Sequence, residues 1–595
     1  MRLVVLLQNM TNPIRSTFLL ASLLLIAASA TGQWSATAAT NLAIGDGAGD
    51  QVQTKVAPLP DGGCYISWYD SDPSGSPAFG YDVRVQRLDA GGIELWAHRG
   101  VLVADRGFSS TQDYDLDVDV AGNAILAFRD DRLTGTQITA ASVDGNGNLL
   151  WGANGVQLTS TTNFVAAPKI CGTTDGFVVV AWLENSDARV QRLDLAGTPQ
   201  WATDVVLSIA GFNVAPSDLH ESDAGSAIVA LQRGGGFTTP RFLYAQKLDT
   251  AGGLLWGAGH VAVYDTGSLQ FGNFPTFVPD SNGGAVFSWY GTNPALECFA
   301  QHLNAVGVEQ FVHNGVSVAN GAADRTGPAV AFDAGTQTTF VTYNEISGPN
   351  YRVGAQAFDA TGNRLWGSGG VAVTNYGAAA TSDVRALSID GGVMALWAEE
   401  PGFAQDRLFA SRLDAAGSTV LVPTLLSSTP AVKYRLDAAL SSLGYVIVAW
   451  QDEGSGTSDV LAQNVLPNGT LGSVASAISR NGTGINPVIY TTSERPAVGQ
   501  TWTGQIAHAP TALFTAALFD LAPLNGPVVP GIGEVLVAFP SAFLSVQVAT
   551  GASDDHALTL PADLVFVGTL IYTQALVLDG VGFALGNALD LTVGL

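Results

Sequence analysis

One stretch of the sequence decides the fold: Val85-Gln86-Arg87-Leu88-Asp89-Ala90-Gly91-Gly92-Ile93-Glu94-Leu95-Trp96. The phrase returns as Ala141-Ser142-Val143-Asp144-Gly145-Asn146-Gly147-Asn148-Leu149-Leu150-Trp151. Further copies are centred on Asp194, Asp249, Asn304, Asp359 and Asp414. An eighth, less regular copy has Leu466 in the Asp position. The copies follow one another at intervals of 50 to 55 residues, and a period of this length indicates a propeller, a solenoid or another repeat array.

Each repeat contains four short runs that are typical of β-strands. In the third repeat these runs are residues 164–170, 176–182, 188–193 and 199–207. They are rich in β-branched and aromatic residues and are bounded by Gly, Asp and Asn, while no part of the repeat region has a sustained helical period. Four strands per repeat are typical of a propeller blade. We therefore predict an all-β fold with an eight-bladed β-propeller over residues 34–485, whose last blade is closed by the N-terminal run 33–37.

The phrase Leu-Asp-Ala-x-Gly predicts a tight turn between the third and fourth runs. Asp at the first turn position accepts backbone N–H groups, and Gly at the fourth position tolerates a positive φ. Asp and Gly keep this spacing at Asp89/Gly92, Asp194/Gly197, Asp249/Gly252, Asp359/Gly362 and Asp414/Gly417. The alternative is a calcium loop, suggested by Asp144-Gly145-Asn146-Gly147-Asn148, but this fragment lacks the full EF-hand pattern. Side-chain bonding to the local backbone is sufficient to explain the phrase.

Large apolar residues recur at two positions of the repeat. Near the end of the second run stand Trp68, Phe128, Trp182, Leu231, Trp289, Tyr343, Trp397 and Trp450. On the fourth run stand Trp96, Trp151, Trp201, Trp256, Phe311 and Trp366. Stacked repeats must bury a continuous core against their neighbours, so we expect these side chains to pack between blades rather than to line a ligand cleft.

An acidic residue follows the second-run aromatic position by two residues in six of the eight repeats. These acids, our candidate site residues, are Asp70, Asp130, Glu184, Glu345, Glu399 and Asp452. A Gln recurs on the third run as Gln86, Gln191, Gln246, Gln301, Gln356 and Gln463. Residues at i and i+2 point to the same side of a strand, so the acids are expected to form a ring. The ring either satisfies polar groups within each blade or binds Ca²⁺ or a cationic ligand. Its recurrence favours the first interpretation, and no metal is predicted.

The phrase Ala245-Gln246-Lys247-Leu248-Asp249-Thr250-Ala251-Gly252-Gly253-Leu254-Leu255-Trp256 resembles the repeats of exported bacterial β-propeller proteins of uncharacterised function. It is also similar to the tryptophan-docking motif of quinoprotein propellers, whose spacings are one residue longer, and in style to the sialidase Asp-box, whose spacing is shorter. The resemblance covers about residues 34–485 and implies a propeller, without implying catalytic or cofactor residues.

The repeat phrase stops after Gly472, yet strand-like runs continue to the end of the chain. Such runs are residues 500–504, 512–518, 534–539 and 565–579. The run 565–579 and the ending 583–595 resemble a C-terminal β-sandwich module found in exported proteins of planctomycete-type bacteria. That resemblance implies export and surface attachment. We predict that residues 487–595 form a separate β-sandwich.

The N-terminus is typical of a targeting segment. Arg15 precedes the apolar run 17–28, and Ala28-Ser29-Ala30 matches a small-x-small cleavage pattern. We predict a signal peptide over residues 1–30, with an N-terminal membrane anchor as the alternative. The protein is then extracellular, at the cell surface or periplasmic, and keeps no membrane span after cleavage. In that setting Cys64, Cys171 and Cys298 permit one disulfide, but their wide separation favours three small buried apolar residues.

Charge and motifs narrow the function. The net charge of −26 disfavours nucleic acid as a partner. The chain has no HExxH, GxSxG or P-loop pattern, so no catalytic or cofactor residue is predicted, although a hydrolase triad stays open because its members need not be neighbours in sequence. We expect an exported, non-enzymatic binding or scaffold protein with a protein or glycan ligand. The alternative is a carbohydrate-active enzyme, a propeller glycosidase or lyase, in which a lone carboxylate pair flanks one sugar site.

Overall fold

The computed structural model describes residues 33–71, 80–107, 114–235, 239–292, 295–454, 456–473 and 475–595. The expected signal peptide, residues 1–30, lies outside these ranges. The described elements are β-strands except for two single-turn 3-10 segments, η1 (Asp223–Gly225) and η2 (Leu564–Phe566). The predicted all-β class is therefore confirmed. Within the same ranges no helix is long and apolar enough to cross a membrane.

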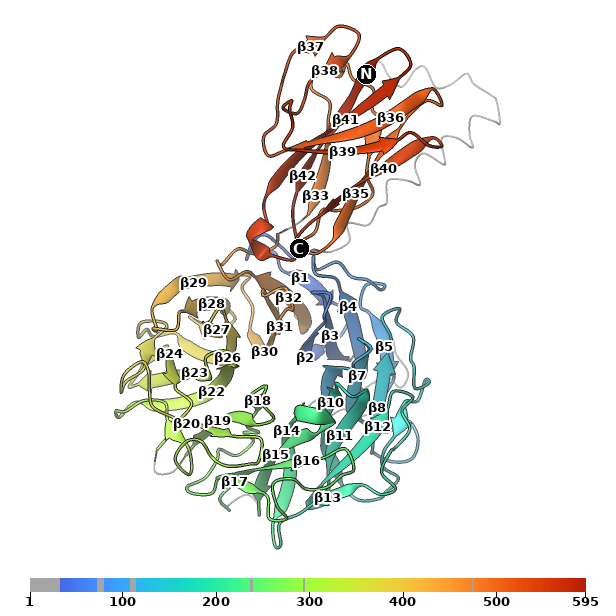
Figure 1. Ribbon diagram of the computed structural model, residues 1–595. Helices are drawn as coiled ribbons and strands as arrows, with labels where there is room; N and C mark the ends of the chain where they lie inside the picture. The colour runs from blue at the N-terminus through green and yellow to red at the C-terminus, as the bar shows by residue number, and fades with distance from the viewer. Residues whose placement is uncertain are drawn as a thin grey trace, which may run out of the picture.

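The repeats fold as four-stranded antiparallel sheets set around a common axis (Figure 1). Eight such sheets are found in the described residues. Their first strands are β2 (Gln51–Pro58), β6 (Tyr114–Val118), β10 (Val165–Thr173), β14 (Asn213–Glu221), β18 (Phe277–Pro279), β22 (Asp324–Asp333), β26 (Ala380–Ile389) and β30 (Lys433–Leu440). The second strands are β3 (Cys64–Asp70), β7 (Ala124–Asp130), β11 (Phe177–Glu184), β15 (Ala227–Gly234), β19 (Ala285–Gly291), β23 (Thr338–Ser347), β27 (Gly392–Glu400) and β31 (Val446–Asp452). The third strands are β4 (Asp82–Leu88), β8 (Gln137–Val143), β12 (Asp187–Asp194), β16 (Phe242–Leu248), β20 (Glu297–Leu303), β24 (Asn350–Phe358), β28 (Arg407–Leu413) and β32 (Asp459–Val465). The outer strands are β5 (Val101–Ala104), β9 (Val156–Gln157), β13 (Val205–Leu207), β17 (Val261–Tyr264), β21 (Val316–Ser317), β25 (Val371–Ala372), β29 (Thr419–Ser427) and β1 (Leu42–Gly45).

The ring is closed by the two ends of the repeat region. Each first strand contacts the first strand of the next sheet, and β30 contacts β2. In the closing sheet β1 pairs with β32, with Leu42 opposite Ala462. An N-terminal segment thus supplies the outer strand, as expected, but the strand is Leu42–Gly45 and not the run 33–37. This arrangement, with contacts passing from sheet to sheet around an axis, is a β-propeller.

The recurrent tryptophans fasten each sheet to the next one. The Trp151 indole lies against Gly197 in the turn of the following sheet, where an added Cβ would be 3.0 Å from the ring. Its Nε1 donates to the carbonyl oxygen of Leu195 (2.9 Å). The same bond joins Trp34 to Ala90, Trp96 to Gly145, Trp201 to Thr250, Trp256 to Ala305 and Trp366 to Ala415. We had expected these tryptophans to lie on the outer strands. They precede those strands instead, because the segment that carries each tryptophan leaves its own sheet to reach the neighbouring sheet.

The run 33–37 therefore closes the ring through a side chain. Trp34 docks on Gly92 of the first sheet and takes the place that tryptophan fills in five other repeats. It is 2% exposed. The turn role of the phrase is also confirmed, since Asp194 Oδ1 accepts from Ala196 N (2.9 Å) and Thr198 N (2.8 Å). Gly197 has a φ of 80°, a conformation that glycine adopts without a steric cost.

The second strands form the core between neighbouring sheets. Trp182 and Trp450 are fully buried, which confirms that they pack between blades. Cys64, Cys171 and Cys298 are buried free thiols, so the apolar interpretation of the cysteines is confirmed.

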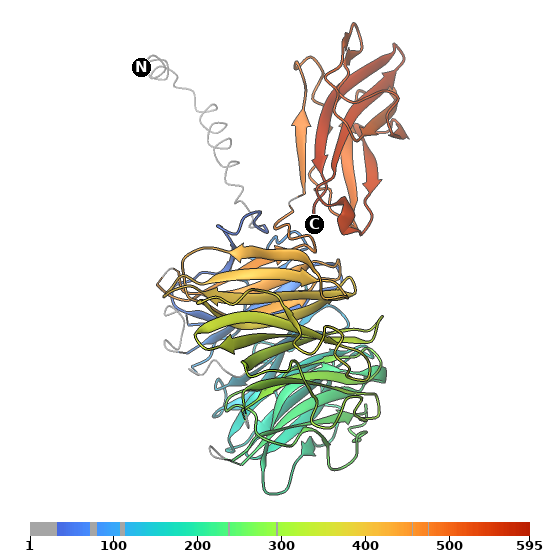
Figure 2. The same ribbon diagram turned by 90° about the vertical axis from the view of Figure 1, so that its left-hand side faces the viewer.

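The C-terminal region forms two further sheets and a small hairpin (Figure 2). A five-stranded sheet has the order β33 (Ser476–Arg480), β42 (Phe583–Thr592), β41 (Leu570–Asp579), β36 (Ala512–Asp520), β39 (Phe543–Val548). A three-stranded sheet has the order β34 (Tyr490–Thr491), β35 (Thr501–Ala507), β40 (Ser553–Thr559). The hairpin is formed by β37 (Val528–Val529) and β38 (Gly533–Glu534).

The pairing of β33 with β42 places residues 476–480 in this region. The expected boundary at residues 485–487 therefore moves to before Ser476. Trp502 and Tyr490 lie in the core shared by the two sheets. At its base, Leu595 joins a buried cluster that also contains Trp34, so the region packs on the sheet where the ring closes.

Candidate functional site

The six predicted acids occupy equivalent places at one end of the second strands. Asp70, Asp130 and Asp452 are the last residues of β3, β7 and β31. Each lies opposite the first residue of its third strand, as Asp70 does opposite Asp82. Glu184 is likewise the last residue of β11, whereas Glu345 and Glu399 lie two residues and one residue before the ends of β23 and β27.

Five of the six carboxylates are paired with cations inside their own sheets. Asp70 contacts Arg84 Nε (2.7 Å) and Arg99 Nη2 (2.9 Å). Asp452 contacts Lys433 Nζ (2.7 Å). The other pairs are Asp130 with Arg132, Glu184 with Arg189, and Glu345 with Arg325 and Arg352. Glu399 makes no ion pair within the described ranges. The structure thus distributes these acids as separate local pairs.

No group of three His, Cys, Asp or Glu side chains among the described residues is placed to hold a metal ion. Whether the acid positions bind Ca²⁺ stays a prediction, because ion pairing within sheets does not measure affinity for a cation.

The recurrent Gln ties the tryptophan segment to the third strand. Gln246 Oε1 accepts from Lys247 N (2.9 Å) and Trp256 N (3.0 Å). Its Nε2 donates to the carbonyl oxygen of Gly257 (2.7 Å). Because these bonds satisfy backbone groups where the chain leaves the sheet, they support the structural interpretation of the Gln positions.

The propeller axis contains a pocket of about 440 Å³ that the sequence did not suggest. It is lined by Gln53, Tyr114, Ala167, Pro168, Lys169, Pro216, Phe271, Gly272, Phe274 and Arg435. These residues come from five of the first strands and from the loop before β18, which meet around the axis (Figure 1). We call this the axial pocket.

Backbone bulges shape its wall. The pairing of first and second strands is interrupted beside Gln53, Ala167 and Arg435. All three have a positive φ, at 60°, 49° and 56°, which is uncommon for residues other than glycine. Gly327 and Asp383 have the same conformation at bulges in two other first strands. The bulge therefore recurs from blade to blade. It brings different side chains to the axis in different blades.

The carboxylates near the axis accept backbone N–H groups from the next sheet. Asp115 accepts from Ile170 N (3.2 Å), and Asp117 accepts from Gly172 N (3.0 Å). Asp437 accepts from Val56 N (2.9 Å), which joins the last sheet to the first. Burial raises the pKa of Asp117 to about 6. These anions are thus committed to contacts between blades.

Two cations line the axial pocket without a bonded partner among the described residues. Within the described ranges, neither the Lys169 ammonium nor the Arg435 guanidinium makes a hydrogen bond or an ion pair. Lys169 is half-buried and Arg435 is exposed. Asp218 is an electrostatic neighbour of Lys169, and although burial opposes its ionisation, His220 and then Lys169 lower the pKa of Asp218 to about 2. Asp218 itself is occupied by His220 and by Phe277 N.

Most histidines face carboxylates. His98 lies between Asp46 (2.8 Å) and Glu94 (3.0 Å), and His313 lies in the same way between Asp265 (3.2 Å) and Glu309. Both histidines link the outer parts of neighbouring sheets. Burial opposes protonation of His98, but Asp46 and Glu94 raise its pKa.

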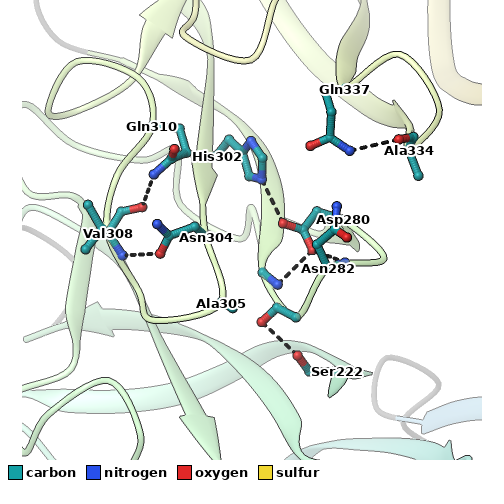
Figure 3. Close-up of polar contacts among 12 residues, drawn as sticks. Ser222, Asp280, Asn282, His302, Asn304, Ala305, Val308, Gln310, Ala334 and Gln337 are labelled. Carbon is teal, nitrogen blue, oxygen red and sulfur yellow. Dashed lines mark hydrogen bonds and ion pairs between the residues drawn. The ribbon is translucent and has the colours of Figure 1, made fainter. Parts of the chain in front are cut away.

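His302 forms a buried pair with Asp280 (2.9 Å), which also accepts from Asn282 N and Gly284 N (Figure 3). Ser222 in the same view donates to the carbonyl oxygen of Gly283 and makes no contact with His302. The arrangement fixes a turn.

The C-terminal region contains a chain of polar contacts that sequence reasoning missed. Ser545 Oγ lies 3.1 Å from His556 Nδ1, and His556 Nε2 lies 3.1 Å from Thr515 Oγ1. Thr515 donates to Asp554 (2.6 Å). A hydroxyl thus stands between the imidazole and the carboxylate, so the contacts differ from those of a hydrolase triad, in which the carboxylate orients the imidazole directly.

Comparisons with known proteins give likeness in structure alone. No family model matches the chain, and no curated protein matches it in sequence. The Dos1 propeller is similar over 73% of this chain and 95% of its own, at 13% identity and a TM-score of 0.40. An ulvan lyase of polysaccharide lyase family PL25 is similar over 74% and 97%, at 10% identity and a TM-score of 0.41. A fungal alcohol oxidase of the AA5 family covers 80% and 96%, at 15% identity and a TM-score of 0.36. At these values the similarities assign neither an activity nor a ligand to this chain.

Proposed function

We propose that this chain is an exported, non-enzymatic binding protein whose ligand carries an anionic group and binds in the axial pocket. Its body is an eight-bladed propeller, followed by a β-sandwich. The eight four-stranded sheets and the closing pair β1–β32 support the first part. The two facing sheets around Trp502 support the second. Export is supported by the apolar run 17–28 and the cleavage pattern at Ala28-Ser29-Ala30.

The single observation that carries the choice of ligand is that the two cations of the pocket have no bonded partner among the described residues. The nearby carboxylates are occupied by backbone N–H groups, whereas Lys169 and Arg435 are unpaired within the described ranges. In a protein of net charge −26, two cations without a bonded partner in one pocket are free to bind an anionic group directly. A carboxylate or sulfate of the ligand supplies the missing partner.

The pocket also limits the size and kind of ligand. Its volume of about 440 Å³ lies in the range of small-molecule sites, which bury most of a compact ligand. Phe271 and Phe274 are half exposed at its rim and offer apolar surface beside the cations. An acidic sugar unit has both features, because its ring carries apolar C–H faces and its acid group carries the charge.

The test is a glycan array that includes acidic and neutral members, probed with the mature chain. We expect binding to acidic glycans that weakens as salt is added. Lys169→Ala and Arg435→Ala should each weaken binding about tenfold, equivalent to the loss of one charge-assisted hydrogen bond. Arg407→Ala is the matched control, because Arg407 is exposed and lies outside the pocket.

Selective binding of neutral glycans, or equal loss with Arg407→Ala, would contradict the proposed ligand class. Release of shorter products from any bound glycan would show an enzyme and would favour the glycosidase or lyase alternative. Absence of binding to every glycan would reject the axial pocket as a glycan site.

A further inference from the structure

One edge of the five-stranded sheet is exposed and apolar. β39 has the sequence Phe-Leu-Ser-Val-Gln-Val and pairs with β36 alone among the described residues. Leu544, Val546 and Val548 are 49%, 52% and 64% exposed. The strand contains no charge, proline or glycine, the devices by which proteins usually prevent an edge from pairing. It therefore has the properties of a strand that accepts a neighbour.

The outward main-chain groups of this edge can be identified. Ala549 N donates to the carbonyl oxygen of Leu513 (3.0 Å), in the register that sets Val548 opposite Phe514. In an antiparallel ladder only alternate residues bond to a given neighbour. The N–H and C=O groups of Leu544, Val546 and Val548 therefore point away from β36, toward a further strand.

Beside this edge lies an apolar groove of about 700 Å³. Leu544 and Val546 line it together with side chains of β36, β41, β42 and the segment 532–539. All of the exposed surface inside it is apolar. The inner face of the same sheet is already covered by the three-stranded sheet, so the groove is the outer face left open. Phe514, Leu544, Val546 and Phe583 in its lining are 42%, 49%, 52% and 52% exposed, so the groove presents large apolar side chains to solvent.

Charge selects the kind of partner. Residues 475–595 contain eight carboxylates and two arginines. Asp520 accepts from Ala542 N (3.2 Å) and so stands at the beginning of β39. Asp579 lies opposite Ala512, at the other end of the sheet region that lines the groove. A second copy of this chain would bring like charges together, whereas a segment with basic flanks would be attracted by Asp520 at the beginning of β39 and by the excess of carboxylates in this region.

We propose that β39 and its groove bind an extended polypeptide segment of another protein, in which apolar residues alternate between basic flanks. The segment adds to the sheet as a sixth strand. Main-chain bonds to Leu544, Val546 and Val548 hold it, and its alternate side chains enter the groove. This inference is independent of the axial pocket, since the pocket and β39 lie in different sheets.

The experiment uses the full mature chain and a labelled synthetic peptide in which valine and threonine alternate between flanking lysines. A peptide with glutamate flanks and one interrupted by proline are the comparison probes. We expect the lysine-flanked peptide to bind at least about tenfold more tightly than either, as measured by fluorescence polarisation.

Val546→Pro removes one outward N–H while leaving the bonds to β36, and proline is tolerated where the N–H of an edge strand faces solvent. It should abolish peptide binding without lowering the melting temperature. Val546→Lys is the second variant, which keeps the N–H but repels basic flanks. Gln547→Ala is the matched control, because Gln547 lies on the same strand with its N–H directed to β36.

Unchanged binding in a folded Val546→Pro or Val546→Lys variant would overturn the proposal. So would equal binding of all three peptides, or no binding of the lysine-flanked one. Self-association of the wild-type chain that Val546→Pro abolishes, measured by light scattering, would also overturn it and would assign the edge to a second copy.

Discussion

The outer edges of the propeller differ from the edge of the C-terminal region. In the propeller β9, β21 and β25 are two residues long and β13 is three. β39 is six residues long and apolar on its exposed side. Very short edge strands offer little template for another chain, and closure of the ring covers the inner edges. Among the described outer strands the exception is β29, which has nine residues but contains Pro423, and proline cannot donate a hydrogen bond to an added strand. The difference teaches that a strand partner is expected first at β39.

The largest expected effect breaks the closed ring. Trp34→Ala removes a buried indole and its bond to Ala90. Loss of a buried tryptophan costs about 3–5 kcal/mol, so the unfolding midpoint of the propeller in denaturant should fall clearly. Leu95→Ala is the control, because Leu95 is 46% exposed. An unchanged midpoint for Trp34→Ala would mean that the ring does not depend on this closure.

An intermediate effect tests the closure at the axis. Asp437→Ala leaves Val56 N without its acceptor across the junction of the last and first sheets. An unsatisfied backbone group of this kind costs about 1–3 kcal/mol. Asp383→Ala removes a similar bond, to Arg435 N, between two sheets that the chain already joins. We expect the first change to lower the free energy of unfolding more; equal losses would remove the distinction between the closing junction and the others.

The smallest effect concerns pH and the outer rim of the propeller. The pKa of His313 is raised chiefly by Glu309, and that of His98 by Asp46 and Glu94 against the opposing effect of burial. A folded-state pKa above the ordinary value of 6.5 stabilises the fold below that pH, and the contribution is lost as pH rises through the raised pKa. Because both imidazoles are about half exposed, each contributes less than about 1 kcal/mol.

The double variant His98→Gln/His313→Gln should therefore lose stability at pH 5 and little at pH 8. Thermal unfolding at the two pH values measures this difference. Equal losses at both values would show that the imidazoles act through packing and not through charge.

Much of the propeller could be predicted because its signals are local. The turn around Asp194 depends on residues within four positions, and the burial of Trp182 follows from its place in a repeat. The docking of each tryptophan on the next turn could not be predicted from one repeat, because the contact joins two repeats. The regular phrase indicated only that the same tryptophan recurs. The strand that closes the ring was placed too early, at 33–37, because Trp34 resembles the tryptophan of the other repeats.

The two candidate binding places could not be predicted in this way. Lys169 and Arg435 meet at the axis because the ring brings distant repeats together, and each looks like an ordinary surface cation in sequence. The strand β39 was missed because its six residues carry no turn signal of the repeat kind, whereas the apolar run 534–539 was expected to be a strand and holds only the end of β38. Whether an apolar run becomes a central strand or an open edge strand depends on which other strands pair with it, and this is not visible in the run itself.

The closing strand β1 also orders events in time. It lies near the beginning of the chain, and its surroundings bond to residues that are made much later, as Ser458 N does to Asp50 across 408 positions. Contacts between such distant residues form slowly, so the first strand waits unpaired while the intervening sheets are made and fold. A chain that stops early keeps this strand open and presents a protease with an unpaired segment near its N-terminus. A chain that ends before β32 therefore cannot form the pair that closes the ring.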